Sequence, residues 1–273
     1  MKVGETVFMN KICVIAKNKE TFFIKRLIEE LGQNVDIFDP WSDFILPEAD
    51  RYLVRTTGVY GSDLDLLLLK TIPKNKVINS LEVLQRFRSK TSQYLWFEEQ
   101  DVPLLPWLSL KNTDLITIEK FFRLYPEVVV KPNIGQGGWG IEVLRWSDYK
   151  SWKKKKGKDE DYLIQPYLKG ATEFRYFFMK DFSPIVLKRM GKTGVAANFR
   201  QNGKANLATL PPEFSSVIEN LVIKSQALYG AIDLLVLDER PVVLELNTVP
   251  GIEQLEKISG ENIIQRFKEF YFY

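Results

Sequence analysis

Two acidic side chains and one amide near the C-terminal end have the types and the spacing of a metal site. Asp233 lies in one apolar run, and Glu245 and Asn247 lie in the next. The polar trio 238–240 between the runs predicts a three-residue hairpin loop, which places Asp233 directly opposite Glu245. Asn247 then shares their face of the sheet, because side chains alternate along a strand.

Facing carboxylates in an apolar hairpin repel each other, and a bound divalent cation would turn that cost into binding. The all-oxygen set of Asp233, Glu245 and Asn247 suits Mg²⁺, which takes one or two carboxylates and completes its shell with phosphates and water. The alternative is that the two carboxylates are solvated separately on an exposed face. The hypothesis depends on the hairpin loop, because a change of one residue in its length would place the acids on opposite faces.

A glycine-rich segment at 135–140 satisfies the pattern G-x-G-x-x-G. Strands are expected on both sides of it, whereas the dinucleotide-binding fingerprint needs a helix after the glycines. We therefore expect a flap whose backbone amides, including those of Gly137 and Gly138, close over phosphates. Lys131 ends the preceding strand and could add a positive charge. The alternative is a glycine-rich hairpin with no ligand.

The chain contains no histidine among its 273 residues. Mechanisms that depend on Ser-His-Asp or Cys-His groups are therefore excluded, as is a zinc site with histidine ligands. The usual general base at neutral pH is also missing. Chemistry in this protein must rely on carboxylates, Lys, Arg, metal ions or backbone dipoles.

The remaining composition is typical of a globular protein in a reducing compartment. The single cysteine, Cys13, allows no intrachain disulfide. No apolar stretch approaches the roughly 20 residues of a membrane helix, and no signal peptide is recognised. We therefore expect a cytoplasmic protein without a membrane partner. The net charge of +3 favours no nucleic-acid partner, and the lysine run 153–158 is interpreted as a solvated loop or helix end.

Strands and helices alternate over the first 88 residues, which predicts an α/β unit with a parallel sheet at 1–88. From residue 89 onward the pattern becomes richer in strands. The expected strands are 11–16, 35–38, 52–54, 76–79, 128–131, 141–144, 163–165, 174–179 and 185–187, with helices at 22–31, 64–69, 91–100 and 212–229 and a hairpin at 232–247.

Together these residues resemble the ATP-grasp superfamily and, within it, the RimK-like amino-acid ligases. The resemblance covers residues 89–265 and extends more faintly to the N-terminal unit. It implies an ATP-grasp fold at 89–273, in which two α+β subdomains sandwich ATP and a lid covers about 100–165, preceded by a small pre-ATP-grasp α/β domain at 1–88. It is most specific in the last third of the chain, where twelve residues occur at the RimK-like spacing: Asp233, Pro241, Glu245, Leu246, Asn247, Pro250, Gly251, Glu253, Glu256, Lys257, Gly260 and Ile263.

The resemblance also implies roles for individual residues. Lys90 and Lys131 resemble the two lysines that hold the ATP phosphates, and Asp233, Glu245 and Asn247 fall on the metal ligands. The resemblance implies a hinge that meets adenine at Gln165, Pro166, Tyr167 and Leu168, and a ribose contact at Glu173. It also implies that Arg200 and Asn202 are the Arg-x-Asn near the γ-phosphate, and that Arg175 and Arg189 are the arginines near the substrate.

The activity that the resemblance implies is ATP-dependent ligation of a carboxylate to an amine, with Mg²⁺ or Mn²⁺. The carboxylate attacks the γ-phosphate to give an acyl phosphate, which the amine then attacks. Such chemistry needs charge neutralisation and positioning rather than a histidine, and Arg200 is expected to stabilise the transition state. The implied partners are amino-acid, peptide or protein substrates, and a homo-oligomer is compatible. An ATP-grasp phosphotransferase, a non-catalytic nucleotide-binding module and an RNA-binding role are the alternatives.

Overall fold

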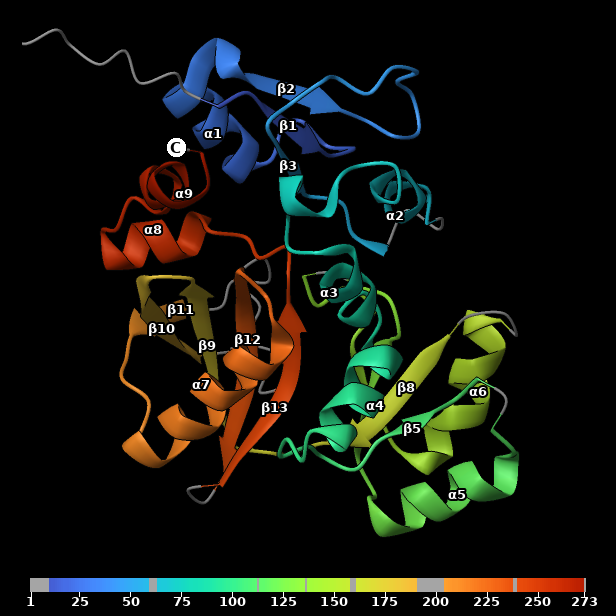
Figure 1. The fold of residues 1–273 in the computed structure, drawn as a ribbon. Helices are drawn as coiled ribbons and strands as arrows, with labels where there is room; N and C mark the ends of the chain where they lie inside the picture. The colour runs from blue at the N-terminus through green and yellow to red at the C-terminus, as the bar shows by residue number, and fades with distance from the viewer. Residues whose placement is uncertain are drawn as a thin grey trace, which may run out of the picture.

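A computed structural model describes residues 10–58, 63–111, 113–135, 137–157, 161–190, 204–237 and 240–272. Three sheets build this part of the chain, and Figure 1 shows one of them above the other two, which lie next to each other. We call them the N-terminal, middle and C-terminal sheets. Among the described helices, none has the length and apolarity needed to cross a bilayer.

The N-terminal sheet is parallel throughout, with the strand order β2-β1-β3-β4. The central strand is apolar and fully buried, as expected when helices cover both faces of a parallel sheet. Gly32 follows α1 with a φ of 56°, which confirms the predicted helix end. The elements are β1 (Ile12–Ile15), α1 (Phe22–Leu31), η1 (Gly32–Asn34), β2 (Val35–Phe38), β3 (Arg51–Val54), α2 (Leu64–Leu69), η3 (Lys74–Lys76) and β4 (Val77–Ile78).

The middle sheet is antiparallel, with the order β5-β8-β6-β7. A core with a row of aromatic rings joins the sheet to α5 and α6. The lysines 153–156 form the last turn of α6, where their positive charges interact favourably with the helix dipole. The elements that reach and form this sheet are α3 (Leu81–Arg86), α4 (Lys90–Glu99), β5 (Leu108–Ser109), α5 (Leu115–Leu124), β6 (Val128–Pro132), β7 (Glu142–Leu144), α6 (Trp146–Lys156) and β8 (Tyr162–Pro166).

The C-terminal sheet is antiparallel, with the order β11-β10-β9-β12-β13. Helix α7 covers one face, and it ends at Ser225, earlier than the predicted 229, because Gln226 turns into the left-handed region. The elements are β9 (Thr172–Met179), β10 (Phe182–Met190), β11 (Lys204–Leu207), α7 (Pro212–Ser225), β12 (Tyr229–Leu237), β13 (Arg240–Asn247), α8 (Glu253–Ser259) and α9 (Ile263–Tyr271).

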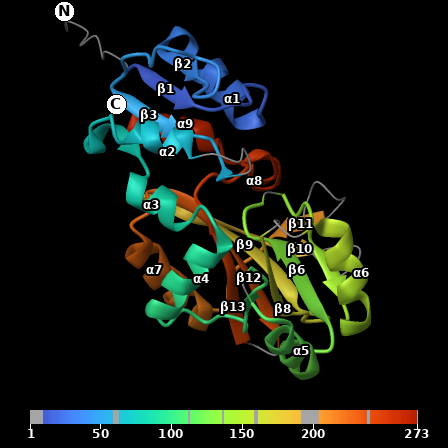
Figure 2. The ribbon, with the colours of Figure 1, turned by 90° about the vertical axis from the view of Figure 1, so that its right-hand side faces the viewer.

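The last helix returns to the N-terminal sheet, as Figure 2 shows by the red helices below β1 and β3. Phe267 of α9 is fully buried, and its ring lies 5.4 Å from that of Phe23 and 4.7 Å from that of Tyr229. One apolar core therefore joins the first sheet to the third. The prediction of a domain boundary near residue 88 stays a prediction.

The hairpin of β12 and β13 differs from its predicted form. Arg240 belongs to β13 and pairs with Leu237, so the connection is one residue shorter than the predicted loop. A bulge after Asp233 compensates: Leu234 pairs with Val243, whereas Asp233 pairs with Glu245. The predicted three-residue loop was wrong, but the predicted opposition of Asp233 and Glu245 is confirmed, because the extra residue in β13 restores the register.

Candidate active site

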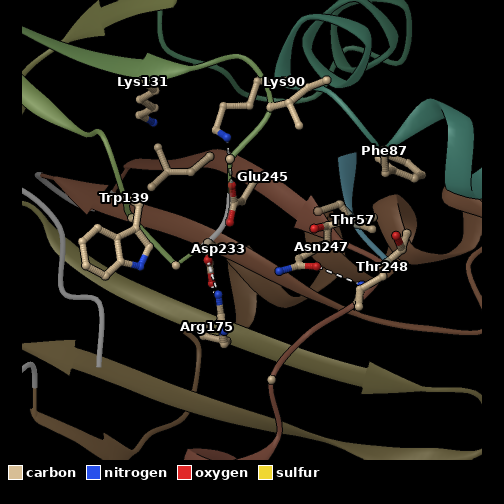
Figure 3. Close-up of a pocket in the computed structure, with 18 of the residues that line it drawn as sticks. Thr57, Phe87, Lys90, Lys131, Trp139, Arg175, Asp233, Glu245, Asn247 and Thr248 are labelled. Carbon is tan, nitrogen blue, oxygen red and sulfur yellow. Dashed lines mark hydrogen bonds and ion pairs between the residues drawn. The ribbon is translucent and has the colours of Figure 1, made fainter. Parts of the chain in front are cut away.

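A cleft of about 660 Å³ lies where the three sheets meet. Its wall includes the loops after β1 and β3 of the N-terminal sheet, the glycine-rich loop between β6 and β7, and the hairpin of β12 and β13. Figure 3 shows side chains from these elements pointing into the same space. A site shared by three sheets can hold a ligand that none of them could enclose alone.

The acidic pair of the hairpin lies on the cleft side. Asp233 is 5 % exposed and pairs across the strands with Glu245, whose side chain is 30 % exposed. Asn247 also lines the cleft, and its Oδ1 accepts a hydrogen bond of 2.9 Å from the backbone N–H of Val249. Three oxygen-bearing side chains on one face fit a magnesium ion, because hard cations prefer oxygen ligands.

Arg175 holds Asp233 in place. The two residues are neighbours across β9 and β12. The Arg175 guanidinium donates to both carboxylate oxygens, with Nε 2.6 Å from Oδ1 and Nη2 2.5 Å from Oδ2. Burial acts to raise the pKa of Asp233, but Arg175 and Arg189 outweigh it and lower that pKa. Asp233 is therefore ionised, as a metal ligand must be.

Arg189 and Glu173 form a second pair beside the first. They face each other across β10 and β9, and Nη1 of Arg189 donates to Oε1 of Glu173 at 2.8 Å. The same nitrogen lies 3.6 Å from Oδ2 of Asp233. Glu173, predicted to contact ribose, thus orients an arginine in this structure, and both residues line the cleft.

Two lysines face the acids from the opposite wall. Lys90 begins α4, and its Nζ lies 4.0 Å from Oε2 of Glu245. Lys131 on β6 is 8 % exposed, and burial together with the nearby Lys90 lowers its pKa to about 8, against the opposite effect of carboxylates such as Glu245. Two cations held this close favour a ligand with several negative charges, such as a polyphosphate.

Gln165, the first residue of the predicted hinge, is hydrogen-bonded to Lys131. Its Oε1 accepts hydrogen bonds from Nζ of Lys131 at 2.8 Å and from the hydroxyl of Tyr94 at 3.2 Å. Because both donors point at the oxygen, the amide orientation is fixed, and Nε2 is buried without a partner among the described residues. A ligand in the cleft can supply the missing acceptor, which fits the predicted nucleotide. The hinge residues Pro166, Tyr167 and Leu168 line the same cleft.

Residues 90–270 match the family of the RimK-like ATP-grasp domain. The chain belongs to this family. The predicted resemblance is thereby confirmed, and it covers the cleft-lining segments from α4 to α8.

Relatives that match most of this chain are named as glutamate ligases. The chain is 26 % identical over 284 residues to a probable alpha-L-glutamate ligase of Picosynechococcus sp., and the match covers 95 % of this chain and 94 % of that one. It is 27 % identical over 256 residues to the tetrahydromethanopterin:alpha-L-glutamate ligase of Methanocaldococcus jannaschii, covering 87 % of this chain and 84 % of that one.

A solved structure shares the fold of this RimK-like protein. It is the ATP-grasp ligase PsnB, complexed with a minimal precursor, Mg and ADP, which superposes with a TM-score of 0.70 at 16 % identity. The match covers 95 % of each chain. The predicted fold, an ATP-grasp domain together with a parallel α/β unit, is confirmed.

Most of the predicted site residues of this RimK-like chain meet in one cleft. Lys90, Lys131, Gly137, Gly138, Gln165, Pro166, Tyr167, Leu168, Glu173, Arg175, Arg189, Asp233, Glu245 and Asn247 all line it. Arg200 and Asn202 lie outside the described residues.

Two supporting residues of the RimK-like site were not predicted. Gln93 accepts a hydrogen bond of 2.9 Å from the backbone N–H of Leu246, and Asn133 accepts one of 2.9 Å from that of Thr91. These amides fix α4 to β13 and to the glycine-rich loop. Their only sequence signal is a polar residue within a predicted helix or after a predicted strand, which is too common to single them out.

Proposed function

We propose that this RimK-like protein is an ATP-dependent ligase that uses Mg²⁺ to join the carboxylate of one substrate to the amine of another. The observation that carries the proposal is the arrangement of charges in the cleft. The facing acids Asp233 and Glu245 lie on one wall, and Lys90 and Lys131 lie on the other. Such a pair of walls suits a metal–polyphosphate complex, with the ion against the acids and the phosphates between the ion and the lysines.

In this proposal each described residue has a defined task. Asp233, Glu245 and Asn247 hold Mg²⁺, or Mn²⁺ in its place, and Arg175 keeps the Asp233 carboxylate oriented and ionised. Lys90 and Lys131 bind phosphate oxygens. Bound metal would supply neutralisation of the charge that develops on the transferred phosphoryl group. The residues Gly137, Gly138 and Glu173 and the hinge segment 165–168 surround the rest of the nucleotide.

The reaction needs no protein nucleophile. A carboxylate oxygen attacks the γ-phosphorus of ATP, and the bond between the γ-phosphorus and the oxygen that bridges to the β-phosphate breaks. ADP is released, and the substrate is now an acyl phosphate. The amine nitrogen then attacks the acyl carbon, phosphate leaves with the former carboxylate oxygen, and one proton is released to solvent. We assign orientation of the carboxylate by a forked contact to Arg189, and stabilisation of the transferring phosphate to Arg200 together with Asn202.

The relatives named above suggest the first substrate to try. Because both are named as alpha-L-glutamate ligases, we propose L-glutamate as one substrate, with an amino acid, peptide or protein as the other. The proposed setting is the cytoplasm. The proposed domain division remains 1–88 and 89–273, with the lid at about 100–165.

A phosphate-release screen tests this function. Purified protein with Mg-ATP is offered amino acids singly and in pairs, starting from L-glutamate, and the products are identified by mass spectrometry. The proposal predicts phosphate release that requires both a carboxylate and an amine, with one amide formed for each ADP. Phosphorylated product formed with no amine present would instead identify a phosphotransferase, and nucleotide binding without turnover for any pair would indicate a non-catalytic module.

A further inference from the structure

Trp139 in the glycine-rich loop differs from every other tryptophan of the chain. The chain has six. The other five contact an aromatic ring, a cation or a carboxylate: Trp41, Trp96, Trp107, Trp146 and Trp152. Trp139 is 69 % exposed, and no such contact reaches its ring from the described residues. A large aromatic surface left in water is one that a ligand or partner can cover with a gain in free energy.

The backbone fixes where this side chain points. Gly138 and Gly140, on either side of Trp139, both have a φ of 75°, which favours glycine. At Gly140 an added Cβ would lie 2.8 Å from Cγ of Pro132, so the loop returns closely against the end of β6. Trp139 therefore stands at the tip of a tight turn. Figure 3 shows its indole projecting into the cleft toward the end where Lys131, Asp233 and Arg175 lie.

The start of the loop is held in place across the cleft. Its first residue, Asn133, accepts a hydrogen bond of 2.9 Å from the backbone N–H of Lys90 through its carbonyl. Ile134, the next residue, approaches Gly58 of the N-terminal unit so closely that a Cβ there would lie 2.7 Å from its Cγ2. The loop thus spans from α4 to the loop after β3. Trp139, further along the same loop, keeps its ring exposed at the cleft.

We propose that the Trp139 indole closes the γ-phosphate end of the cleft and keeps water away from the activated carboxylate. This inference rests on the proposed ligase function. Hydrolysis is the reaction that competes with ligation, because water can attack the acyl carbon in place of the amine. Phosphate then leaves, the carboxylic acid is regenerated, and the net result is conversion of ATP and water to ADP and phosphate.

An apolar ring at this place has two effects. It occupies the space through which solvent would reach the reacting carbon, and it lowers the local dielectric, so that Lys131 acts more strongly on the phosphates. Neither effect requires the ring to contact adenine. Trp139 is therefore expected to influence the fate of the intermediate more than the affinity for nucleotide.

Acrylamide quenching of tryptophan fluorescence tests the position of the ring. The Trp139→Phe variant is subtracted from the wild type to isolate the Trp139 emission. Mg-AMPPNP with L-glutamate is expected to reduce the quenching of Trp139 several-fold, whereas adenosine alone is expected to leave it unchanged. Shielding by adenosine alone would place the ring over the base and overturn the proposal. Unchanged quenching under Mg-AMPPNP, with binding shown by calorimetry, would overturn it as well.

Coupling measurements test the exclusion of water. With the substrate pair that the wild type joins, Trp139→Ala is expected to form several-fold less amide per ADP released, at an unchanged KM for Mg-ATP, and Trp139→Phe is expected to restore most of the coupling. A raised KM with intact coupling would show that the ring only binds nucleotide. If calorimetry detects no nucleotide binding at all, the proposed function fails and this inference fails with it, whereas failure of the quenching test alone leaves the ligase proposal standing.

Discussion

At the scale of single residues, Asp233 has two roles, of which the sequence indicated only the metal-binding one. It faces Glu245 in the predicted metal site, and it accepts both hydrogen bonds of the Arg175 fork. A carboxylate has about four lone-pair sites, so the two tasks are compatible. The arginine thus lets an acid stay ionised at a place where burial would favour its neutral form.

The two acids should therefore differ in their effect on folding. Asp233→Asn leaves the buried Arg175 without its counter-charge and is expected to lower the free energy of unfolding by about 3–5 kcal/mol. Glu245→Gln, at a half-buried position whose ion pair with Lys90 spans 4.0 Å, is expected to change it by no more than about 1 kcal/mol. Urea denaturation of both variants checks this. Equal losses would contradict the supporting role of Arg175.

The lowered pKa of Lys131 leads us to expect that nucleotide binding depends on pH. Its pKa of about 8 in the structure lies below the ordinary value of 10.5, with burial as the largest cause. Bound phosphates would raise this pKa, so the contribution of Lys131 to affinity is complete below pH 8 and is lost as the pH rises through 8 and above. We expect the Kd for Mg-AMPPNP to increase up to roughly tenfold between pH 7 and pH 9.

Lys131→Met is the control for this titration. It is expected to weaken binding at pH 7 by roughly ten- to hundredfold, the range of a lost hydrogen bond to a charged group, and to abolish the added loss above pH 8. Calorimetry at constant ionic strength measures both variants. A wild-type Kd that stays constant from pH 7 to pH 9 would show that Lys131 does not bind the phosphates.

Residue types at the candidate site could be predicted from the sequence to a large extent, but their partners could not. The spacing of Asp233, Glu245 and Asn247 indicated a common face, and the family resemblance supplied the lysines and arginines. The pairing of Glu173 with Arg189 and the position of Tyr94 beside Gln165 depend on contacts between separate strands and helices. No local pattern encodes such contacts.

At the scale of elements, the hairpin shows how a correct prediction can rest on an incorrect detail. The connection between β12 and β13 is one residue shorter than predicted, and a bulge in β13 restores the register at Glu245. Without the bulge, Leu244 would face Asp233 instead. Apolar runs of this kind do not reveal a bulge, because the inserted residue is itself apolar.

The contact between Gly58 and Ile134 can be tested as a pair. Gly58→Ala places a methyl group 2.7 Å from Cγ2 of Ile134, so the Ile134 side chain must shift, and we expect the start of the glycine-rich loop to shift with it. We expect Mg-AMPPNP to bind several-fold more weakly. Ile134→Ala removes that atom, and the double variant is expected to recover part of the loss, a coupling that a double-mutant cycle measures. Purely additive effects would contradict the contact.

At the scale of the whole molecule, the C-terminal helix joins the two ends of the chain. Sequence periodicity predicted a parallel sheet in the N-terminal part and a strand-rich remainder, and both are present. It could not predict that α9 packs on α1, since helices far apart in the chain carry no mark of which faces meet. The shared core implies that the N-terminal sheet loses its cover when α9 is disturbed.

Cys13 reports on opening of the N-terminal sheet, because it is the single cysteine and is fully buried in β1, in the core that joins this sheet to α2. Burial raises the pKa of its thiol to about 12, so the native protein is expected to resist a thiol reagent at pH 8. Phe267→Ala removes a fully buried ring of α9 and is expected to destabilise the fold by about 3–5 kcal/mol, with a large increase in the rate of thiol modification.

Phe270→Ala on the same helix is the matched control. Phe270 is 39 % exposed, so its removal is expected to leave both the stability and the thiol reaction close to those of the wild type. The rates are measured by the absorbance of the released reporter. A similar acceleration in both variants would show that the α9 core does not protect the N-terminal sheet.

The most direct test of the account is calorimetric titration of AMPPNP into the wild type and into Glu245→Gln, each with and without Mg²⁺. The facing acids and lysines predict tight binding by the wild type only when Mg²⁺ is present. In Glu245→Gln, whose fold is expected to be intact, most of that metal dependence should disappear. Binding that is equally strong without the metal, or unchanged in the variant, would contradict a magnesium–nucleotide site at the hairpin.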